Sequence, residues 1–276
     1  MTKFEAIILG ILQGLTEFLP VSSSGHLVLL QQLLGLKEAE LFFDVCVHLG
    51  TLAAVIAVFH REIKNMTLAL LRLSAAAGKK DRALSTIESD PELKMALLIV
   101  IGSIPTAFLG LAFREIADRL FSSVLIVGLM LVLTGLLLWL TRWTTNNARQ
   151  PGTDRLNLKN AFLIGTVQGL AIIPGISRSG STISIGLLLG IERETAARYS
   201  FLLSIPAVAG AGLLGLHDGL YQTDVSIKIP LVGAVTAALV GYAALKALLQ
   251  VVKKGGLHMF APYCWLVGLL ALIFGW

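Results

Sequence analysis

The sequence predicts an all-α polytopic membrane protein with an inverted-topology internal repeat. We expect six full transmembrane helices and two re-entrant helix-loop-helix hairpins that meet near the membrane centre. Three observations lead to this prediction. Hydrophobic residues make up 55% of the chain and charged residues only 14%, which is outside the range of soluble domains. A polar-interrupted motif occurs twice, and the Lys and Arg residues gather in a subset of the loops.

The first copy of the motif is GILQGLTEFLPVSSSGHLVLLQQLLGL, residues 10–36. Pro20 and the run Ser22–Gly25 divide it into halves of roughly ten to fourteen residues, whereas a spanning helix needs about 20. Non-helical backbone at membrane depth is tolerated only where it is buried in protein or lines a cavity. The break therefore predicts a re-entrant hairpin over 4–35 with a functional site at its tip.

The second copy is GTVQGLAIIPGISRSGSTISIGLLLGI, residues 165–191. Gln13 and Gln168 are 155 positions apart, and so are Gly25 and Gly180. Self-similarity at a fixed offset indicates an internal duplication. Paired interrupted helices in two halves of a membrane protein indicate a binding site between the repeats.

Apolar segments between and after these motifs predict the spanning helices. They cover about 42–59, 95–113, 122–140, 197–216, 229–249 and 260–276. The polar stretch 60–94 contains a short apolar run, which predicts an amphipathic helix on the membrane surface. We place the repeat boundary in the polar segment 141–159. The chain 1–276 is then a single membrane domain with repeats at 1–145 and 156–276, the second hairpin lying at 158–190.

The distribution of positive charge predicts the topology. Three spans separate the hairpins, so the hairpins enter from opposite faces and the repeats are inverted. Sixteen of the 22 Lys and Arg residues lie in loops that this topology places on one side: seven, four, two and three in 60–94, 141–159, 191–198 and 246–258. The positive-inside rule then places both termini and the first hairpin outside.

The tips of the two hairpins are suited to binding an anion. We expect the second half-helices to begin at Gly25-His26 and Gly180-Ser181, and helix N-termini present free N–H groups to anions. Arg178 adds a permanent cation whose guanidinium suits phosphate. These features predict a phosphate site near the bilayer centre.

Three polar residues of the first motif indicate chemistry beyond anion binding. Gln13 and Glu17 are four residues apart and share a helix face. A carboxylate beside phosphates indicates a bridging divalent cation or a proton-transfer role. His26 is a candidate nucleophile or general acid/base.

Structural interpretations compete with these roles. Glu17 and Arg178 could form a buried pair that only holds the repeats together. His26 could be a helix-start residue bonded to a carbonyl, and serines commonly cap helices. Gln168 is better explained by hydrogen bonds to loop backbone than by chemistry. His48, near the start of the span at 42–59, is better explained as a residue at the membrane interface.

The two motifs closely resemble the signatures of the undecaprenyl-diphosphate phosphatase family, the bacitracin-resistance type of integral membrane phosphatase. They are Gln13-Gly-Leu-Thr-Glu17-Phe-Leu-Pro-Val-Ser-Ser-Ser-Gly-His26 and Pro174-Gly-Ile-Ser-Arg-Ser-Gly-Ser-Thr182. The resemblance spans the whole chain. It implies hydrolysis of undecaprenyl diphosphate to undecaprenyl phosphate, which recycles the lipid carrier of peptidoglycan synthesis and gives bacitracin resistance. It also implies a bacterial cytoplasmic (inner) membrane protein. With the first hairpin outside, we expect the active site to open to the outer face, although an inverted repeat could open to either face.

The resemblance further implies a role for each matching residue. The catalytic candidates are Glu17, Ser23, His26 and Arg178, and Ser177 and Thr182 are further phosphate-contacting candidates. Independently of the resemblance, the residues around the two helix starts are substrate-binding candidates, because they add hydroxyl donors or allow close backbone approach: Ser22, Ser24, Gly25, Ser179 and Gly180. The family requires a divalent cation, Mg²⁺ or Ca²⁺, for which Glu17 is the main ligand candidate and Gln13 a second one. The attacking group is Ser23, His26 or an activated water.

The expected partners are the lipid diphosphate substrate and membrane lipids, not nucleic acid, and a homodimer is compatible with this interpretation. The competing function is a lipid-phosphate transporter or flippase, because inverted repeats with broken helices recur in carriers. Glu17 and His26 favour hydrolysis, since a pure carrier needs anion binding but no acid/base. A purely structural role would leave Arg178 at membrane depth unexplained.

Overall fold

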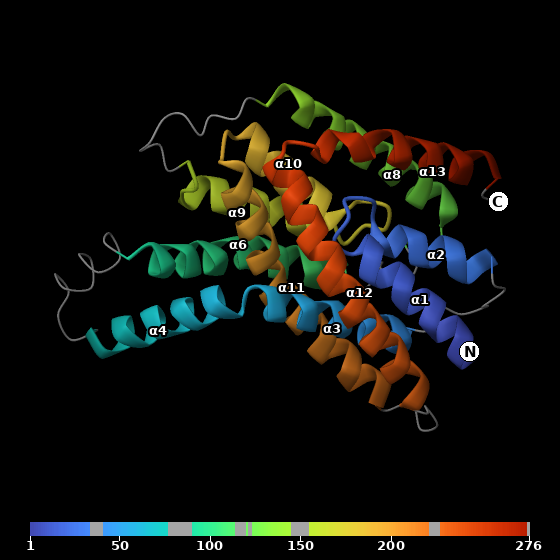
Figure 1. Cartoon of the computed structure of the whole chain (residues 1–276), viewed down its shortest axis with the longest axis horizontal. Helices are drawn as coiled ribbons and strands as arrows, with labels where there is room; N and C mark the ends of the chain where they lie inside the picture. Colours follow the sequence, from blue (N-terminus) through green and yellow to red (C-terminus); the bar gives the residue numbers. More distant parts are fainter. Residues whose placement is uncertain are drawn as a thin grey trace.

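The computed structural model describes residues 1–33, 41–76, 90–113, 120, 123–144, 155–220 and 227–274, and all regular secondary structure among them is helical. Helices long and apolar enough to cross a membrane are Pro91–Phe113, Val124–Trp143, Arg193–Gly215, Lys228–Lys253 and Leu257–Phe274. Phe42–Val58 and His60–Ser74 meet the same requirement as a pair bent by 78°. The protein is therefore an all-helical polytopic membrane protein, as predicted (Figure 1).

The first interrupted segment forms α1 (Lys3–Thr16) and α2 (Ser23–Leu33). A capping box between Thr2 and Glu5 starts α1, which satisfies two of the N–H groups left free at a helix start. The chain then turns at Ser22, whose φ is 69°. This left-handed conformation is uncommon for a residue other than glycine, so the turn is imposed by its surroundings.

The second interrupted segment forms α9 (Leu158–Leu170) and α10 (Arg178–Leu188). Here the positive φ falls on Gly175, at 95°, where it costs little. Ser177 caps α10, its Oγ accepting the N–H of Gly180 at 3.1 Å. The sequence therefore predicted both breaks correctly.

The starts of the second half-helices differ from the prediction by two residues. The structure begins α2 at Ser23 and α10 at Arg178, rather than at Gly25 and Gly180. The reason is capping: the serine immediately before each start accepts an N–H from three residues further along, so the helix begins directly after that serine. Ser23 and Arg178 consequently become first-turn residues.

Each first half-helix packs against a long helix from the other half of the chain. Helix α1 lies along α12 (Lys228–Lys253), and α9 lies along α6 (Pro91–Phe113). A Cβ added at Gly14 of α1 would lie 2.8 Å from a backbone oxygen of α12. A Cβ at Gly165 of α9 would lie 2.0 Å from the oxygen of Gly102 on α6. Glycine is therefore required at both contacts.

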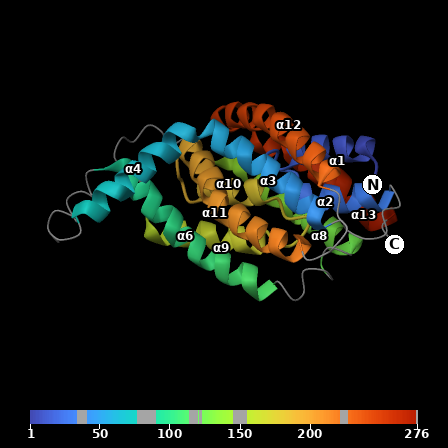
Figure 2. The ribbon, with the colours of Figure 1, turned by 90° about the horizontal axis from the view of Figure 1, so that it is seen from below.

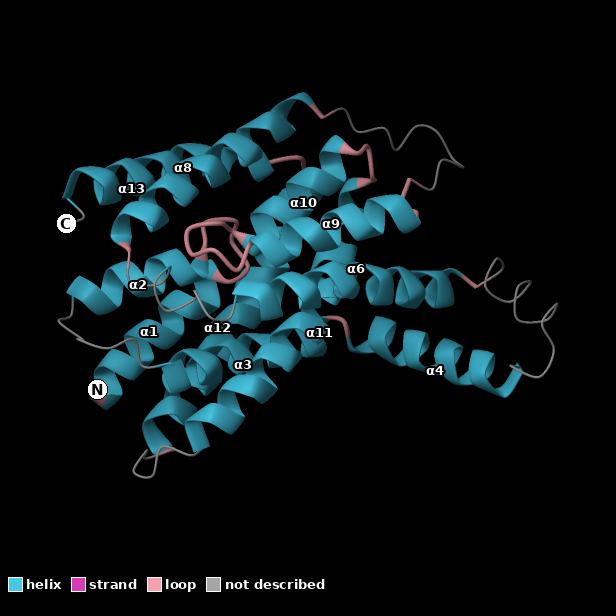
Figure 3. Ribbon diagram, turned by 180° about the vertical axis from the view of Figure 1, so that it is seen from behind, coloured by secondary structure: helices cyan, strands magenta, loops and turns pink. Residues whose placement is uncertain are grey.

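Four of the remaining longer helices surround the two breaks: α3 (Leu41–Val58), α8 (Val124–Leu140), α11 (Arg193–Leu220) and α13 (Ala261–Phe274). The other, α4 (His60–Ala76), contacts α6 and α3. Helix α3 packs on α12 and α11, and α8 packs on α13. Helix α4 extends away from the rest of the bundle (Figures 1 and 2). The two loops that interrupt the half-helices lie side by side at the centre of the molecule (Figure 3).

Two further predictions can be compared with the helices. Residues 60–76 are helical and bent away from α3, in agreement with a separate helix after the first span. Gln168 donates to the oxygen of Leu203 at 3.1 Å, so it does satisfy backbone, but in helix α11 rather than in a loop. Most of the predicted repeat boundary, residues 145–154, and the end of the first predicted hairpin lie outside the described residues.

Candidate active site

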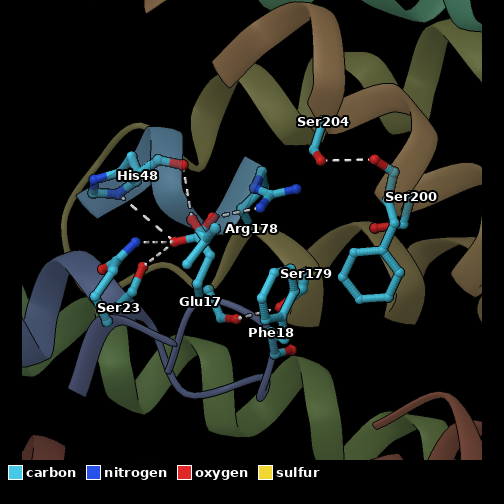
Figure 4. A network of polar contacts seen from close by, with 12 residues as sticks. Glu17, Phe18, Ser23, His48, Arg178, Ser179, Ser200 and Ser204 are labelled. Carbon is cyan, nitrogen blue, oxygen red and sulfur yellow. Dashed lines mark hydrogen bonds and ion pairs between the residues drawn. The ribbon is translucent and has the colours of Figure 1, made fainter. Parts of the chain in front are cut away.

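Glu17, at the C-terminal end of α1, is the centre of the site (Figure 4). Its Oε2 accepts hydrogen bonds from Ser23 Oγ at 2.6 Å and from Gln13 Nε2 at 3.0 Å. Its Oε1 accepts from Arg178 Nη2 at 2.5 Å. Glu17 is only 8% exposed, and a buried carboxylate is stable only when paired and hydrogen-bonded. The structure thus brings together four of the residues that the sequence singled out.

Local structure explains why these side chains converge. Gln13 and Glu17 are one helical turn apart on α1, so their side chains lie next to each other. Ser23 and Arg178 are the first residues of α2 and α10. Because the loops before them lie side by side, both side chains reach the same carboxylate.

Two polar atoms of the site have no hydrogen-bond partner. They are Arg178 Nη1 and Gln13 Oε1, both buried. Buried donors and acceptors without partners are rare in native proteins. A phosphate oxygen is a suitable partner for the guanidinium donor, and a cation or a donor is suitable for the amide oxygen. These two atoms are therefore available to bind a ligand.

A cleft lies beside the Glu17–Arg178 pair, between α3, α10 and α11. Its polar lining comes from Glu17, Arg178, Thr51 and Ser204, and its apolar lining from Phe18, Leu52, Val55 and Val208. Charged and apolar side chains therefore adjoin at this cleft, which in this structure is too narrow to admit a water molecule.

His26 lies on another side of the first loop. Its Nδ1 is 2.8 Å from the oxygen of Ser22, and its Nε2 is 2.8 Å from the hydroxyl of Tyr263 on α13. A carbonyl oxygen only accepts, so Nδ1 carries the hydrogen and Nε2 accepts from Tyr263. The structure therefore places His26 against Ser22 and Tyr263 rather than against Glu17.

Several predicted substrate-binding residues instead join the two loops. Ser22 Oγ accepts the N–H of Gly175 at 3.1 Å, and Ser179 Oγ donates to the oxygen of Phe18 at 3.0 Å. These are reciprocal contacts, each from a serine of one motif to the backbone of the other. Ser22 and Ser179 are both buried. Their hydroxyls therefore hold the two loops against each other.

The other predicted binding residues also have structural contacts. Ser177 caps α10, and Thr182 Oγ1 contacts the oxygen of Arg178 at 2.8 Å and Ser200 Oγ at 2.5 Å. A Cβ at Gly25 would lie 3.3 Å from Gly175 Cα, and one at Gly180 would lie 3.1 Å from Pro20 Cβ, so both glycines allow the loops to approach closely. Ser24 is half-buried, with its Oγ 3.4 Å from Ser22 Oγ.

Three residues that the sequence did not select also belong to the site or its support. His48 Nε2 lies 3.7 Å from Glu17 Oε2. Thr134 of α8 donates to the oxygen of Gly175 at 3.0 Å, and Tyr263 contacts His26. Thr134 is a polar residue in an otherwise apolar span, which was a usable signal. Nothing local in the sequence distinguishes Tyr263.

The residues of this site provide only part of the ligand set that a divalent cation needs. Among the described residues there is no cluster of three or more His, Cys, Asp and Glu side chains that could hold a metal. Mg²⁺, however, is commonly bound through one or two carboxylates together with substrate phosphates. Glu17 and the unpartnered Oε1 of Gln13 provide oxygen ligands of that kind. The residues present therefore fit a cation that is shared with a phosphate substrate.

Comparison with known proteins agrees with the motifs. The family model described as bacitracin resistance protein BacA matches residues 6–270. A protein named undecaprenyl-diphosphatase from Desulfatibacillum aliphaticivorans is 51% identical over 274 residues, covering 99% of each chain. Proteins of the same name from Desulforapulum autotrophicum and Halothermothrix orenii are 50% and 45% identical, covering 100% and 99% of this chain and 99% and 98% of theirs. The chain therefore belongs to the bacitracin resistance protein BacA family.

Proposed function

We propose that this protein hydrolyses undecaprenyl diphosphate to undecaprenyl phosphate and inorganic phosphate, recycling the lipid carrier of peptidoglycan synthesis and giving bacitracin resistance. One observation carries the proposal. The hydroxyl of Ser23 is hydrogen-bonded to Glu17, whose other oxygen binds Arg178, next to the apolar side chains of Leu52, Val55 and Val208. The names of the full-length relatives supply the identity of the lipid.

Arg178 and the helix starts bind the diphosphate in this proposal. Arg178 Nη2 remains on Glu17 while the unpartnered Nη1 donates to an oxygen of the terminal phosphate. The first turns of α2 and α10 add backbone N–H groups and the positive ends of two helix dipoles. Because phosphoryl transfer depends mainly on positioning and charge stabilisation, these groups account for most of the catalysis.

Ser23 is the attacking group that the geometry supports best. Glu17 Oε2, 2.6 Å from Ser23 Oγ, takes the hydroxyl proton as Oγ forms a bond to the terminal phosphorus. The bond between that phosphorus and the bridging oxygen breaks, and undecaprenyl phosphate leaves. A water then hydrolyses the phosphoserine and restores the hydroxyl. His26 is the weaker candidate because both its ring nitrogens are engaged.

The divalent cation, Mg²⁺ or Ca²⁺, would be held by Glu17 and Gln13 together with substrate oxygens. When bound, it supplies further neutralisation of phosphate charge. Gln13 cannot replace a second carboxylate in charge, so we expect the cation to bind tightly only together with the diphosphate.

We further propose the inverted repeat with two re-entrant hairpins. The reciprocal packing of α1 on α12 and of α9 on α6 supports it, as does the equivalent capping of α2 and α10 by Ser22 and Ser177. With the loop charges described above, this topology puts both termini outside a bacterial cytoplasmic membrane. The site then opens to the outer face.

The test is phosphate release from undecaprenyl diphosphate by the detergent-purified protein. We expect release with Mg²⁺, none with chelator and none from Arg178→Ala. Arg198→Ala is the matched control, because Arg198 pairs with Glu92 at 2.9 Å away from the site, and it should keep its activity. A folded wild-type protein that releases no phosphate but moves lipid phosphate across proteoliposomes would replace this proposal with transport.

A further inference from the structure

We propose that Tyr263 is a positioning residue for the reaction: it fixes the orientation of the His26 ring, and His26 in turn holds the loop that presents Ser23. Tyr263 lies in the first turn of α13, and its hydroxyl donates to His26 Nε2 at 2.8 Å. The two rings are stacked, with centroids 5.7 Å apart and an angle of 7° between their planes. Both the hydrogen bond and the stacking therefore restrain the imidazole.

His26 transmits this restraint to Ser22. Because the carbonyl oxygen of Ser22 only accepts, the hydrogen of the neutral ring is on Nδ1, which donates to that oxygen at 2.8 Å. The backbone N–H of His26 donates to the same oxygen at 3.2 Å. The Tyr263 hydroxyl on Nε2 holds the ring in the orientation in which Nδ1 faces Ser22.

Ser22 needs this support because of its backbone conformation. Among the described residues, it is the only one other than glycine with a positive φ. Strained residues persist only where their surroundings determine them. Its Oγ is also held, by the N–H groups of Gly25 and Gly175. Ser23 follows directly, so a change at Ser22 would move the Ser23 hydroxyl away from Glu17.

A second contact from α13 reaches the same loop. Cys264, next to Tyr263, is buried, and its Sγ donates to the oxygen of Pro20 at 3.5 Å. Two consecutive residues of α13 therefore brace the first loop, one directly and one through His26. This assigns α13, far away in the sequence, a part in positioning the site.

The consequence for the reaction rests on the proposed function. Small misplacements of a reacting group cost rate rather than affinity, so loss of the Tyr263 hydroxyl should lower kcat and leave KM near its wild-type value. The expected decrease is roughly three- to tenfold, as for the loss of one net hydrogen bond.

The experiment compares Tyr263→Phe with Tyr242→Phe in the full-length protein. Phenylalanine keeps the ring that stacks on His26 and removes only the hydroxyl. Tyr242, also a half-exposed tyrosine, lies under Lys246 on α12 and serves as the matched control. Thermal unfolding verifies that both variants fold.

Two readouts are needed. NMR of the ring nitrogens in isotope-labelled histidine, with the His26 signal identified by its loss in His26→Asn, should show the Nδ1–H tautomer in the wild type and in Tyr242→Phe. In Tyr263→Phe the Nδ1–H signal should shift as the ring loses its fixed orientation and the hydrogen bond to Ser22 weakens, together with the decrease in kcat.

An unchanged Nδ1–H signal of His26 in Tyr263→Phe, or an Nε2–H tautomer in the wild type, would overturn the proposal. A rise in kcat would also overturn it, because Tyr263 would then be blocking an attacking imidazole. If the wild-type protein released no phosphate, the proposed function would fail, whereas the NMR result would still decide whether Tyr263 orients the imidazole.

Discussion

Ser23 and Arg178 occupy equivalent positions in the two motifs and donate hydrogen bonds to opposite oxygens of one carboxylate. Each is the first residue of its helix and follows a capping serine. Ser23 Oγ binds Glu17 Oε2, and Arg178 Nη2 binds Oε1. The duplicated scaffold therefore delivers two different groups, a hydroxyl and a guanidinium, to the same point. The second motif has no acidic residue equivalent to Glu17, because Ala171 and Ile172 follow its first half-helix.

Arg178→Lys should separate a structural ion pair from a phosphate-binding arginine. A lysine can still neutralise Glu17, but it lacks the second arm of the guanidinium. We expect the melting temperature to stay near that of the wild type while turnover falls by about 10²-fold or more, as for the loss of one transition-state donor. Thermal unfolding and phosphate release measure the two quantities. Wild-type turnover in Arg178→Lys would mean that the pair only holds the repeats together.

His48→Ala should lower kcat/KM by roughly tenfold, the effect of losing about 1.4 kcal/mol of transition-state stabilisation. His48 is the nearest imidazole to Glu17, at 3.7 Å, and 32% of its side chain is exposed. Its Nδ1 is held by the oxygen of Asp44 at 2.6 Å, which leaves Nε2 directed toward the site.

His60→Ala is the control for this variant. His60 Nδ1 is held in the same way by the Ala57 oxygen, at 2.9 Å, but the residue lies at the start of α4 and is exposed. Steady-state kinetics give kcat/KM for both variants, and we expect the decrease only in His48→Ala. Equal kinetics in the two would remove His48 from the site.

Gly165→Ala should destabilise the fold by about 1–3 kcal/mol or more, the usual cost of overpacking. The added methyl group would lie 2.0 Å from the Gly102 oxygen, so α9 and α6 would have to separate. Gly210→Ala is the control, because its Cβ would have no atom within 4 Å. The comparison is made by thermal unfolding in one detergent. Equal stability of the two variants would show that the contact between α9 and α6 is not tight.

The sequence was sufficient to predict that Gln13, Glu17, Ser23 and Arg178 lie together, because their relation follows from helical spacing and from the internal duplication. Helical spacing joins Gln13 to Glu17, and the duplication aligns the loops that carry Ser23 and Arg178. The all-helical membrane fold followed from composition and from the lengths of apolar segments. The predicted helix starts were two residues too late, because Ser22 and Ser177 cap the helices and the sequence pattern did not single out these two serines as caps.

The remaining features depend on packing that no local pattern encodes. His48 reaches Glu17 only because α3 lies beside the first loop, and Tyr263 reaches His26 from 237 residues away. The loop serines gave an ambiguous signal, since a hydroxyl near a phosphate site serves equally well to bind a ligand or a neighbouring loop. In the structure, Ser22 and Ser179 bind the neighbouring loop.

The most direct test of the account is to trap the covalent intermediate. Wild-type protein would be mixed with undecaprenyl diphosphate that carries a radiolabelled terminal phosphate, quenched within one turnover and digested. We predict label on the peptide that contains Ser23, with none in Ser23→Ala and normal labelling in Ser74→Ala, a control on the exposed face of α4. Label on His26, or full turnover by Ser23→Ala, would contradict the assignment of Ser23 as the attacking group activated by Glu17.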